Sequence, residues 1–412
     1  MKLDALRSPR YRRFWFGSIG STGASQLYFV GLSWLVFEMT GSAAYLGLLG
    51  FSMAVPTIVA TLMGGLLADR ANRGRILLLT SILAGLCLSF LTILDLTESA
   101  QIWQVLILAA FLGLISGFDL PARIAFFPSL IESSQMMSAV ALSSILWQGT
   151  RMILPAIGGL LIALVDTWLL FFLCSIGFGV MGWILIGLQT PDKPDPPEGQ
   201  DQSLGAAITF IRREKLFLVL ISITWSSMFF GTSYVQIMPV FAELLGAGEK
   251  GYGYLISATG VGSVCGTLII GRFQHSPLLG RYMMGGAVLF ALSLLFFAAV
   301  TGLLEGGPVA FYAACGCAIL GGIGGSCFLI SSMTVLQIAV PDALRGRVMG
   351  IHSITFSLIA LGGLVLGPIA ELLSAPTAVL FGAITLIISL IVFSARFPNL
   401  WRLNAQNSNY KI

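Results

Sequence analysis

Long apolar runs alternate with short polar stretches along the whole chain. Each run is about as long as the 20 or so residues that an α-helix needs to cross the hydrocarbon core of a bilayer. Glycines, prolines and charges mark the breaks between the runs. The pattern predicts twelve transmembrane helices, near residues 14–38, 43–68, 75–95, 102–124, 138–164, 167–188, 216–242, 251–272, 281–302, 308–336, 347–371 and 376–397.

Composition agrees with this pattern. Hydrophobic residues make up 57% of the 412 residues and charged residues only 10%, whereas water-soluble globular proteins carry about 25% charged residues. The expected fold is therefore that of an all-α polytopic membrane protein, with twelve transmembrane helices in two six-helix bundles.

The basic residues predict the orientation of these helices. Lys and Arg lie before the first span and after the second, sixth, eighth, tenth and twelfth spans, all on one face, and on the opposite face Lys250 stands alone beside several acids. Since basic loops are retained in the cytoplasm, we expect both termini on the cytoplasmic side of the inner membrane. The net charge of +4 then reflects topology, and no basic groove with aromatic partners indicates a nucleic acid.

One polar break divides the spans six and six. The stretch "TPDKPDPPEGQDQS", residues 190–203, holds four prolines and four acids, which exclude a helix and a membrane span. We expect an N-terminal bundle over 1–189, a cytoplasmic linker with a short amphipathic helix over 190–215 and a C-terminal bundle over 216–412. A faint echo between the second and eighth spans is typical of pseudo-symmetric halves with a substrate site between them.

The densest group of charges beside a span is "GGLLADRANRGRILL", residues 64–78. It resembles the major facilitator superfamily signature between helices two and three, G-x-L-A-D-R-x-G-R-K. The chain departs from that signature at Asn72, which tolerates a left-handed turn, and at Gly74. The matching positions are Gly65, Leu67, Ala68, Asp69, Arg70 and Arg73.

Other stretches resemble the drug and siderophore exporter branch of this superfamily, which includes macrolide-efflux and enterobactin-exporter relatives. They are "FEMTGSAAYLGLLG", "FDLPARIAFFPSLI" and "QIAVPDALRGRVMG". The fifth span carries "TRMILPAIGGLL", which is similar to the antiporter motif G-P-x-x-G-G at Pro155, Gly158 and Gly159. Leu154 replaces the first glycine of that motif, although Pro155 still allows a bend and the glycines close packing.

The resemblance implies alternating access, with a cytoplasmic gate whose contacts stabilise the outward-open state. It implies a contact of Asp69 with Arg347 and one of Arg73 with Asp119. Asp119 and Arg123 are spaced i, i+4 and could instead pair with each other. The resemblance thus places a conformational gate at Gly65, Asp69, Arg70, Arg73, Asp119, Arg123 and Arg347.

Candidates for proton coupling are few. Asp119 is one candidate, and the alternative for it is a structural or gating role. Glu38, near the outer end of the first span, is the second candidate, and the alternative for it is that its side chain merely faces water. His352 is typical of an interface histidine. No carboxylate lies clearly at the midplane, so antiport against protons is implied by the resemblance alone.

Arg151 is a permanent charge near the centre of the fifth span, where a charge costs a few kcal/mol unless it is paired or hydrated. Three interpretations stay open. It bridges helices through carbonyls and Gln148 or Gln26, it binds an anionic group of the substrate as a bidentate donor, or it modulates a nearby acid during proton exchange.

By the same resemblance, the central cavity draws on the first, fourth, seventh and tenth spans. Aromatic and Met walls with a few polar groups suit a large amphipathic ligand, and ordinary helix packing is the alternative for each residue. With Arg151, the candidate substrate-binding residues are Gln26, Tyr28, Trp225, Met228, Tyr234, Gln236 and Ser326.

The sequence contains no pattern for catalysis, a metal or a cofactor. The six cysteines lack C-x-x-C spacing, and the two histidines lie far apart. We therefore expect a monomeric exporter of a siderophore-like or amphipathic anionic metabolite, working against protons and surrounded by membrane lipids. A multidrug or macrolide efflux pump is the alternative; a lipid flippase, an importer and a non-transporting sensor are further ones.

Overall fold

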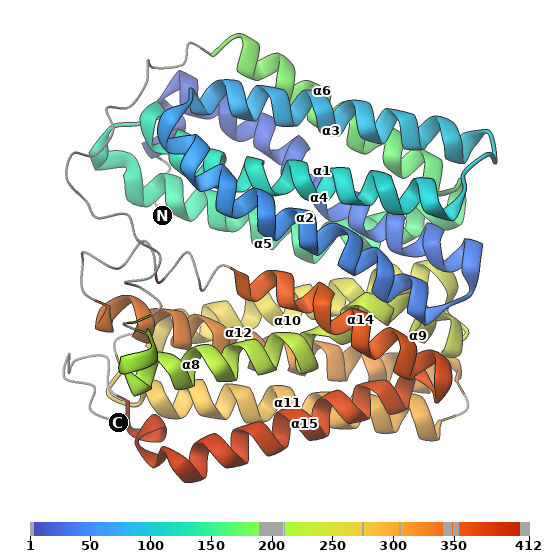
Figure 1. The fold of residues 1–412 in the computed structure, drawn as a ribbon, viewed down its shortest axis with the longest axis vertical. Coiled ribbons are helices and arrows are strands. Elements are labelled where there is room, and N and C mark those ends of the chain that lie inside the picture. Colours follow the sequence, from blue (N-terminus) through green and yellow to red (C-terminus); the bar gives the residue numbers. More distant parts are fainter. Residues whose placement is uncertain are drawn as a thin grey trace. The chain divides into compact units, whose positions relative to one another are not determined.

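The chain forms long α-helices joined by short connections, as the computed structural model shows (Figure 1). It divides into two compact units. Unit 1 is Met1–Gly41 with Leu48–Glu198, and unit 2 is Ser42–Gly47 with Gly199–Ile412. The structure describes residues 4–188, 209, 211–273, 276–304, 306–340, 348 and 354–403, without the side chains of 65–70, 133 and 354.

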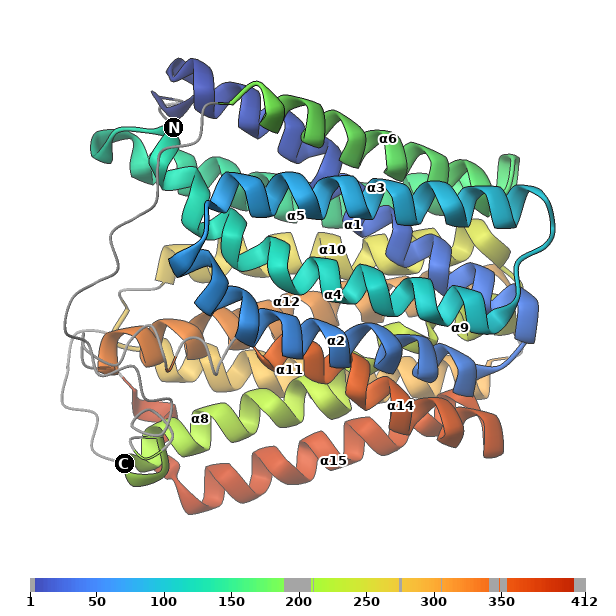
Figure 2. The ribbon, with the colours of Figure 1, turned by 45° about the horizontal axis from the view of Figure 1, so that its top comes forward.

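Unit 1 is a bundle in which consecutive long helices run in opposite directions (Figure 2). In it, α6 packs against α1 and α3, α4 packs against α3, and α5 packs against α1. The long helices are α1 (Pro9–Thr40), α2 (Ala43–Arg70, whose residues 43–47 belong to unit 2), α3 (Arg73–Leu96), α4 (Ile102–Phe126), α5 (Met136–Leu164) and α6 (Thr167–Ile186), and the short 3₁₀ turns are η1 (Asp4–Arg7), η2 (Phe127–Leu130) and η3 (Ser133–Gln135).

Unit 2 is a second helical bundle, in which α12 packs against α10 and α11, and α15 packs against α11 and α14. The short amphipathic helix predicted within 190–215 is described only at residue 209 and over 211–215, where 209 and 211–213 are helical. The helices of unit 2 are α8 (Lys215–Ser226), η4 (Ser227–Gly231), η5 (Thr232–Ile237), α9 (Met238–Leu244), α10 (Gly248–Phe273), α11 (Leu279–Leu303), α12 (Gly307–Ala339), η6 (Ile354–Phe356), α14 (Ser357–Leu372), α15 (Ala375–Arg396) and η7 (Pro398–Arg402).

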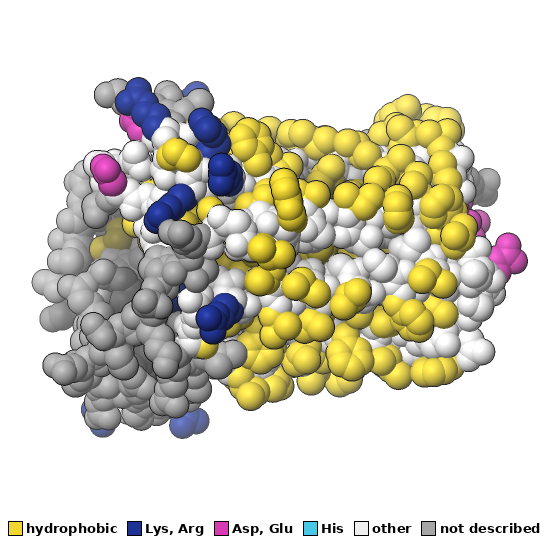
Figure 3. Space-filling model, turned by 90° about the horizontal axis from the view of Figure 1, so that it is seen from above, with side chains coloured by type: hydrophobic (Ala, Val, Ile, Leu, Met, Phe, Trp, Pro, Cys, Tyr) yellow, Lys and Arg dark blue, Asp and Glu magenta, His cyan; other side chains and the backbone are white. Residues whose placement is uncertain are grey.

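The twelve-span all-α fold predicted from the sequence is confirmed. Ten helices in the described part of the chain are long and apolar enough to cross a membrane. The other two predicted spans are α1, whose glycine, serine and threonine run over 17–25 lowers its hydropathy, and α14, which is described over only 16 residues. On the face shown in Figure 3, a broad hydrophobic surface separates two polar ends, and Lys and Arg gather at one of them.

Local sequence signals explain where the helices begin and end. The Ser8 side chain accepts a hydrogen bond from the Tyr11 backbone N–H, and Pro9 occupies the first turn, so α1 begins before the predicted residue 14. At its other end Gly41 adopts a left-handed conformation with φ of 62°, which glycine takes at no steric cost. Asn72 caps α3 by accepting from the Arg75 backbone N–H.

The seventh span is irregular, which the sequence did not predict. After α8 it passes through the π-helical turn η4 and the 3₁₀ helix η5 before α9. The backbone of this stretch lies directly against glycines of neighbouring helices, because a Cβ at Gly362 would meet the Phe229 carbonyl and one at Gly382 the Phe230 carbonyl. Such π-turns are frequent at functional sites.

Glycines also set the closest helix crossings. In unit 2, α10 and α12 approach so closely that a Cβ at Gly262 would meet the Ile319 carbonyl and one at Gly322 the Thr259 carbonyl. Small residues allow this approach in membranes, where packing replaces the hydrophobic effect.

Candidate functional site

An ion pair lies among the helices of unit 1. On α4, Arg123 Nε donates to Asp119 Oδ2 at 2.9 Å and a terminal guanidinium nitrogen donates to Oδ1 at 3.3 Å. The side chain of Arg123 is only 10% exposed and that of Asp119 18%. The pairing predicted from the i, i+4 spacing is therefore present.

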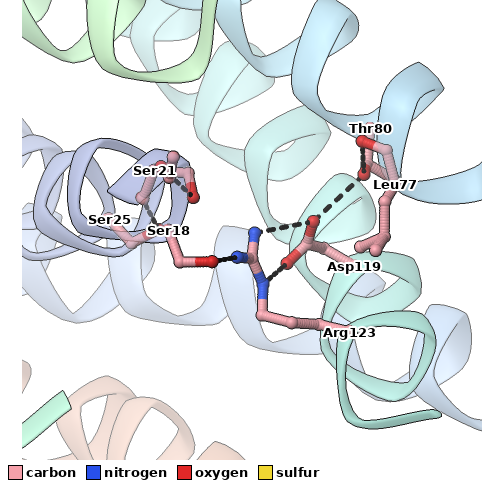
Figure 4. A network of polar contacts seen from close by, with 8 residues as sticks. Ser18, Ser21, Ser25, Leu77, Thr80, Asp119 and Arg123 are labelled. Carbon is pink, nitrogen blue, oxygen red and sulfur yellow. Dashed lines mark hydrogen bonds and ion pairs between the residues drawn. The ribbon is translucent and has the colours of Figure 1, made fainter. Parts of the chain in front are cut away.

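Two further helices complete the network (Figure 4). The hydroxyl of Ser18 on α1 accepts from Arg123 at 3.1 Å, and the hydroxyl of Thr80 on α3 donates to Asp119 at 3.1 Å. The Arg123 guanidinium carbon also lies 6.0 Å from the centre of the Phe14 ring. Each charge thus has several partners, which offsets the desolvation that makes a buried ion pair costly.

The α1 side of this network is a line of small polar residues. Ser18, Ser21 and Ser25 recur at intervals of three and four, so they lie on one face of the helix. The hydroxyls of Ser21 and Ser25 bond to carbonyls one turn earlier in the same helix, those of Gly17 and Ser21. This face can present hydroxyl groups without leaving them unsatisfied.

A cavity of about 160 Å³ adjoins the ion pair inside unit 1. A smaller cavity of about 70 Å³ shares Thr22, Leu120, Arg123 and Trp147 with it. The larger cavity thus combines a charge pair, hydroxyls and aromatic rings, which is the mixture expected where one polar group of a ligand binds. Its lining includes Thr22, Ser25, Tyr28, Ser116, Asp119, Arg123, Trp147 and Phe178.

The predicted gate is only partly described. Arg73 reaches α4, but it donates to the carbonyl of Ala125 at 3.1 Å, while the ion pair of Asp119 is formed with Arg123. The expected contact of Arg73 with Asp119 is thus absent between these two described side chains, because a partner one turn away on the same helix holds the carboxylate. Gly65, Asp69 and Arg70 lie in α2 without described side chains, and Arg347 and His352 lie outside the described residues.

The fifth span keeps its predicted antiporter-like residues in one helix. Pro155, Gly158 and Gly159 are all buried in α5, which continues through the proline. A Cβ at Gly158 would lie 3.2 Å from Leu27 and 3.4 Å from Val30 on α1. These residues therefore favour tight packing of α5 on α1.

Other predicted residues of unit 1 do not all reach the cavity. Tyr28 is buried and lines it, whereas Gln26, half-buried on the same helix, is not among the lining residues. Arg151 on α5 and Glu38 near the end of α1 are exposed. The roles predicted for these two residues stay predictions.

The predicted residues of unit 2 lie mostly in its interior. Tyr234 is 3% exposed, and its ring stands edge-on to Phe297 of α11 at 5.3 Å between ring centres. Ser326 packs on Gly266 of α10. Gln236 is buried beside Gly363, with its side-chain oxygen lacking a hydrogen-bond partner among the described residues.

The two remaining predicted residues of unit 2 flank the start of its π-turn. Met228 is buried, and its sulfur accepts from Thr232 at 3.5 Å. Trp225 is 37% exposed. These contacts suit helix packing, and a role in substrate binding stays a prediction for both.

Sequence reasoning missed Ser18, Thr80 and Trp147. The serine spacing in "SIGSTGAS", residues 18–25, is a signal for a polar face on α1. Thr80 and Trp147 sit in apolar runs that carry no comparable pattern, so only the packing of the helices identifies them.

The chain matches known families over almost its full length. A model of a family described as transmembrane secretion effector matches residues 2–411. The chain is 24% identical over 372 residues to the staphyloferrin A transporter of Staphylococcus aureus, covering 88% of this chain and 90% of that protein. It is 24% identical over 322 residues to the enterobactin exporter EntS of Shigella flexneri, covering 78% and 71%.

Solved transporter structures share the fold. A crystal structure of the nucleoside transporter NupG superposes with a TM-score of 0.71 at 13% identity and covers 94% of this chain and 99% of that chain. A bacterial homologue of the lysosomal transporter Spinster, in an inward-facing unoccupied conformation, gives a TM-score of 0.73 at 14% identity, with 97% of each chain covered. At these identities the likeness concerns the fold alone.

Proposed function

Because the chain belongs to the transmembrane secretion effector family of the major facilitator superfamily, we propose that it exports a siderophore-like anionic metabolite by alternating access. The chain is a multi-pass membrane transporter of small molecules and not an enzyme. The proposal adds the anionic substrate, the outward direction and the coupling to protons.

The observation that carries the proposal is the cavity beside Arg123 in unit 1. It offers a guanidinium group, which matches carboxylates and similar anions, together with hydroxyls and the rings of Tyr28 and Trp147. Relatives named for the transport of staphyloferrin A and the export of enterobactin support the substrate class. Arg151 is proposed as a second anchor for the anion.

The ion pair determines how protons would act on binding. Protonation of Asp119 would neutralise the partner of Arg123 and leave the guanidinium available, so an anion and a proton would favour each other's binding. A cation would instead compete with that proton, which is the behaviour required of an antiporter. Antiport through Asp119 therefore fits the alternative of multidrug or macrolide efflux, and for an anion we propose Glu38 as the carrier.

The test measures ligand-induced thermal stabilisation of purified protein with anionic chelators, macrolides and cationic dyes. Asp119→Asn imitates the protonated acid, so anionic ligands should stabilise this variant more than the wild type. Arg151→Ala should reduce stabilisation by anions, Arg151→Lys should restore part of it, and Arg13→Ala, an exposed arginine at the start of α1, should change nothing.

The contrary result is equally specific. If cationic dyes stabilise the wild type and lose that effect in Asp119→Asn, while Arg151→Ala changes nothing, the anionic substrate is excluded. Multidrug efflux by proton antiport would then take its place.

A further inference from the structure

A groove lined by apolar residues and by Ser394 lies in unit 2 between α11 and α15. Its volume is about 360 Å³, and the two helices pack side by side (Figure 1). Leu390 forms its buried floor, while Leu292 and Ile391 on its walls are 41% and 62% exposed. Both helices are apolar enough to cross a membrane, so the groove opens toward lipid.

The groove is closed at one end by the 3₁₀ helix η7. The backbone N–H of Gly280, at the start of α11, donates to the Leu403 carbonyl at 2.9 Å. A Cβ at Gly280 would meet the Leu400 carbonyl, so glycine is needed for this close contact. The indole N–H of Trp401 donates to the Ser394 hydroxyl at 3.3 Å, which fixes the tryptophan as the end wall of the groove.

Positive charges surround this closed end. Arg281 follows Gly280, Arg402 follows Trp401, and Arg396 lies two residues after Ser394; all three are exposed. Neither α11, α15 nor η7 contains an Asp or Glu residue. The closed end is therefore electropositive, whereas the groove itself is apolar.

We propose that this groove binds one acyl chain of an anionic phospholipid, with the phosphate held by Arg281, Arg396 and Arg402. A dry apolar space of this kind disfavours water, and an alkyl chain matches its lining. Basic clusters beside membrane helices attract anionic headgroups, and a tryptophan is typical of the level where headgroups begin. The site lies in unit 2 and is separate from the cavity beside Arg123.

The test uses the fluorescence of Trp401 in the full-length protein reconstituted in bilayers. The signal is the difference in emission between the wild type and Trp401→Phe, and the probes are phosphatidylglycerol and phosphatidylcholine brominated in their acyl chains. At low mole fraction, the brominated phosphatidylglycerol should quench this signal at several-fold lower concentration than the phosphatidylcholine. Each arginine that contacts the headgroup should contribute up to about five-fold.

Two variants separate the headgroup from the chain. Replacing Arg281, Arg396 and Arg402 together by Gln should remove the preference for phosphatidylglycerol, whereas replacing Arg10, Arg12 and Arg13 together by Gln removes the same charge and should leave it unchanged. The substitution Ile391→Trp fills the groove and should weaken the quenching of Trp401 by both lipids. Because this variant contains an additional tryptophan, the Trp401 signal is here the difference in emission between Ile391→Trp and the double variant Ile391→Trp with Trp401→Phe.

Three results would overturn the proposal. These are equal quenching by the two lipids in the wild type, a preference that survives the triple substitution at the groove, and a dimer in native mass spectrometry that shields Trp401 from both lipids. The last result would assign the groove to a second copy of the chain.

Discussion

The charges on α4 combine a contact that the sequence predicts with contacts that it does not. Asp119 and Arg123 are one helical turn apart, so their pairing follows from spacing alone. Ser18 and Thr80 join them from α1 and α3, and such contacts depend on how three helices pack. The network is therefore more extensive than the pair, and its additional hydrogen bonds offset the cost of burying two charged side chains.

A double-mutant cycle measures the energy of this pair. Asp119→Asn and Arg123→Gln should each destabilise the protein, and the free energy of unfolding should show a coupling of about 0.5–3 kcal/mol between them, as for contacting residues in one network. Unfolding in detergent by denaturant gives the four values required.

The exposed pair Asp4 and Arg7 is the control within the same chain. Its atoms are 3.6 Å apart and the Arg7 side chain is 82% exposed, so its coupling should be small, as for surface pairs in general. Equal coupling in the two cycles would show that burial adds nothing to the α4 pair.

Among the elements, the helices with regular hydrophobic patterns were predictable and the seventh span was not. Its sequence reads as one continuous apolar run over 216–242, yet the structure divides it into α8, η4, η5 and α9. The cause lies in other elements, because Gly362 on α14 and Gly382 on α15 let its backbone approach them. A hydropathy pattern contains no information on such a contact.

The glycine crossing of α10 and α12 gives a prediction for one helix. Gly322→Ala should destabilise the protein by about 1–3 kcal/mol, as overpacking of a tight core does, since the new methyl group would meet the Thr259 carbonyl and lie 2.8 Å from the Ser263 nitrogen. Thermal unfolding in detergent measures the effect.

Gly316→Ala on the same helix is the matched control. A Cβ there has no atom within 4 Å, and alanine favours a helix over glycine by about 1 kcal/mol, so stability should stay the same or rise. If both substitutions destabilise the protein alike, close packing at Gly322 is not the reason.

For the whole molecule, the number of spans was predictable because each helix must be apolar over the membrane thickness. The orientation rests on the basic loops alone. Green fluorescent protein fused after Ile412 should fluoresce and alkaline phosphatase there should be inactive, because we expect this terminus in the cytoplasm. Fusions after Glu98, between the third and fourth spans, should behave in the opposite way. An active phosphatase after Ile412 would reverse the orientation.

The proposed anionic substrate also predicts a response to voltage. An inside-negative potential favours the exit of an anion by about 2.3 kcal/mol per charge for each 100 mV, or roughly 40-fold in the equilibrium ratio. Efflux of a labelled anion from proteoliposomes should thus be faster with a negative interior than at zero potential. Equal efflux rates at the two potentials would contradict a net outward movement of negative charge during transport.

The position of both charges on α4 also affects how the protein is made. A lone Arg or Asp adds up to about 2.5–3.5 kcal/mol to the free energy of insertion when it is at the centre of a span, and less toward its end. Arg123 is in the last turn of α4, and Asp119 lies one turn deeper on the same helix. As soon as α4 is helical, the two side chains can neutralise each other, before α1 or α3 is in place. The fourth span can therefore leave the translocon with its charges already paired, and Arg123→Gln would make the emerging segment, with Asp119 alone, a poorer substrate for insertion.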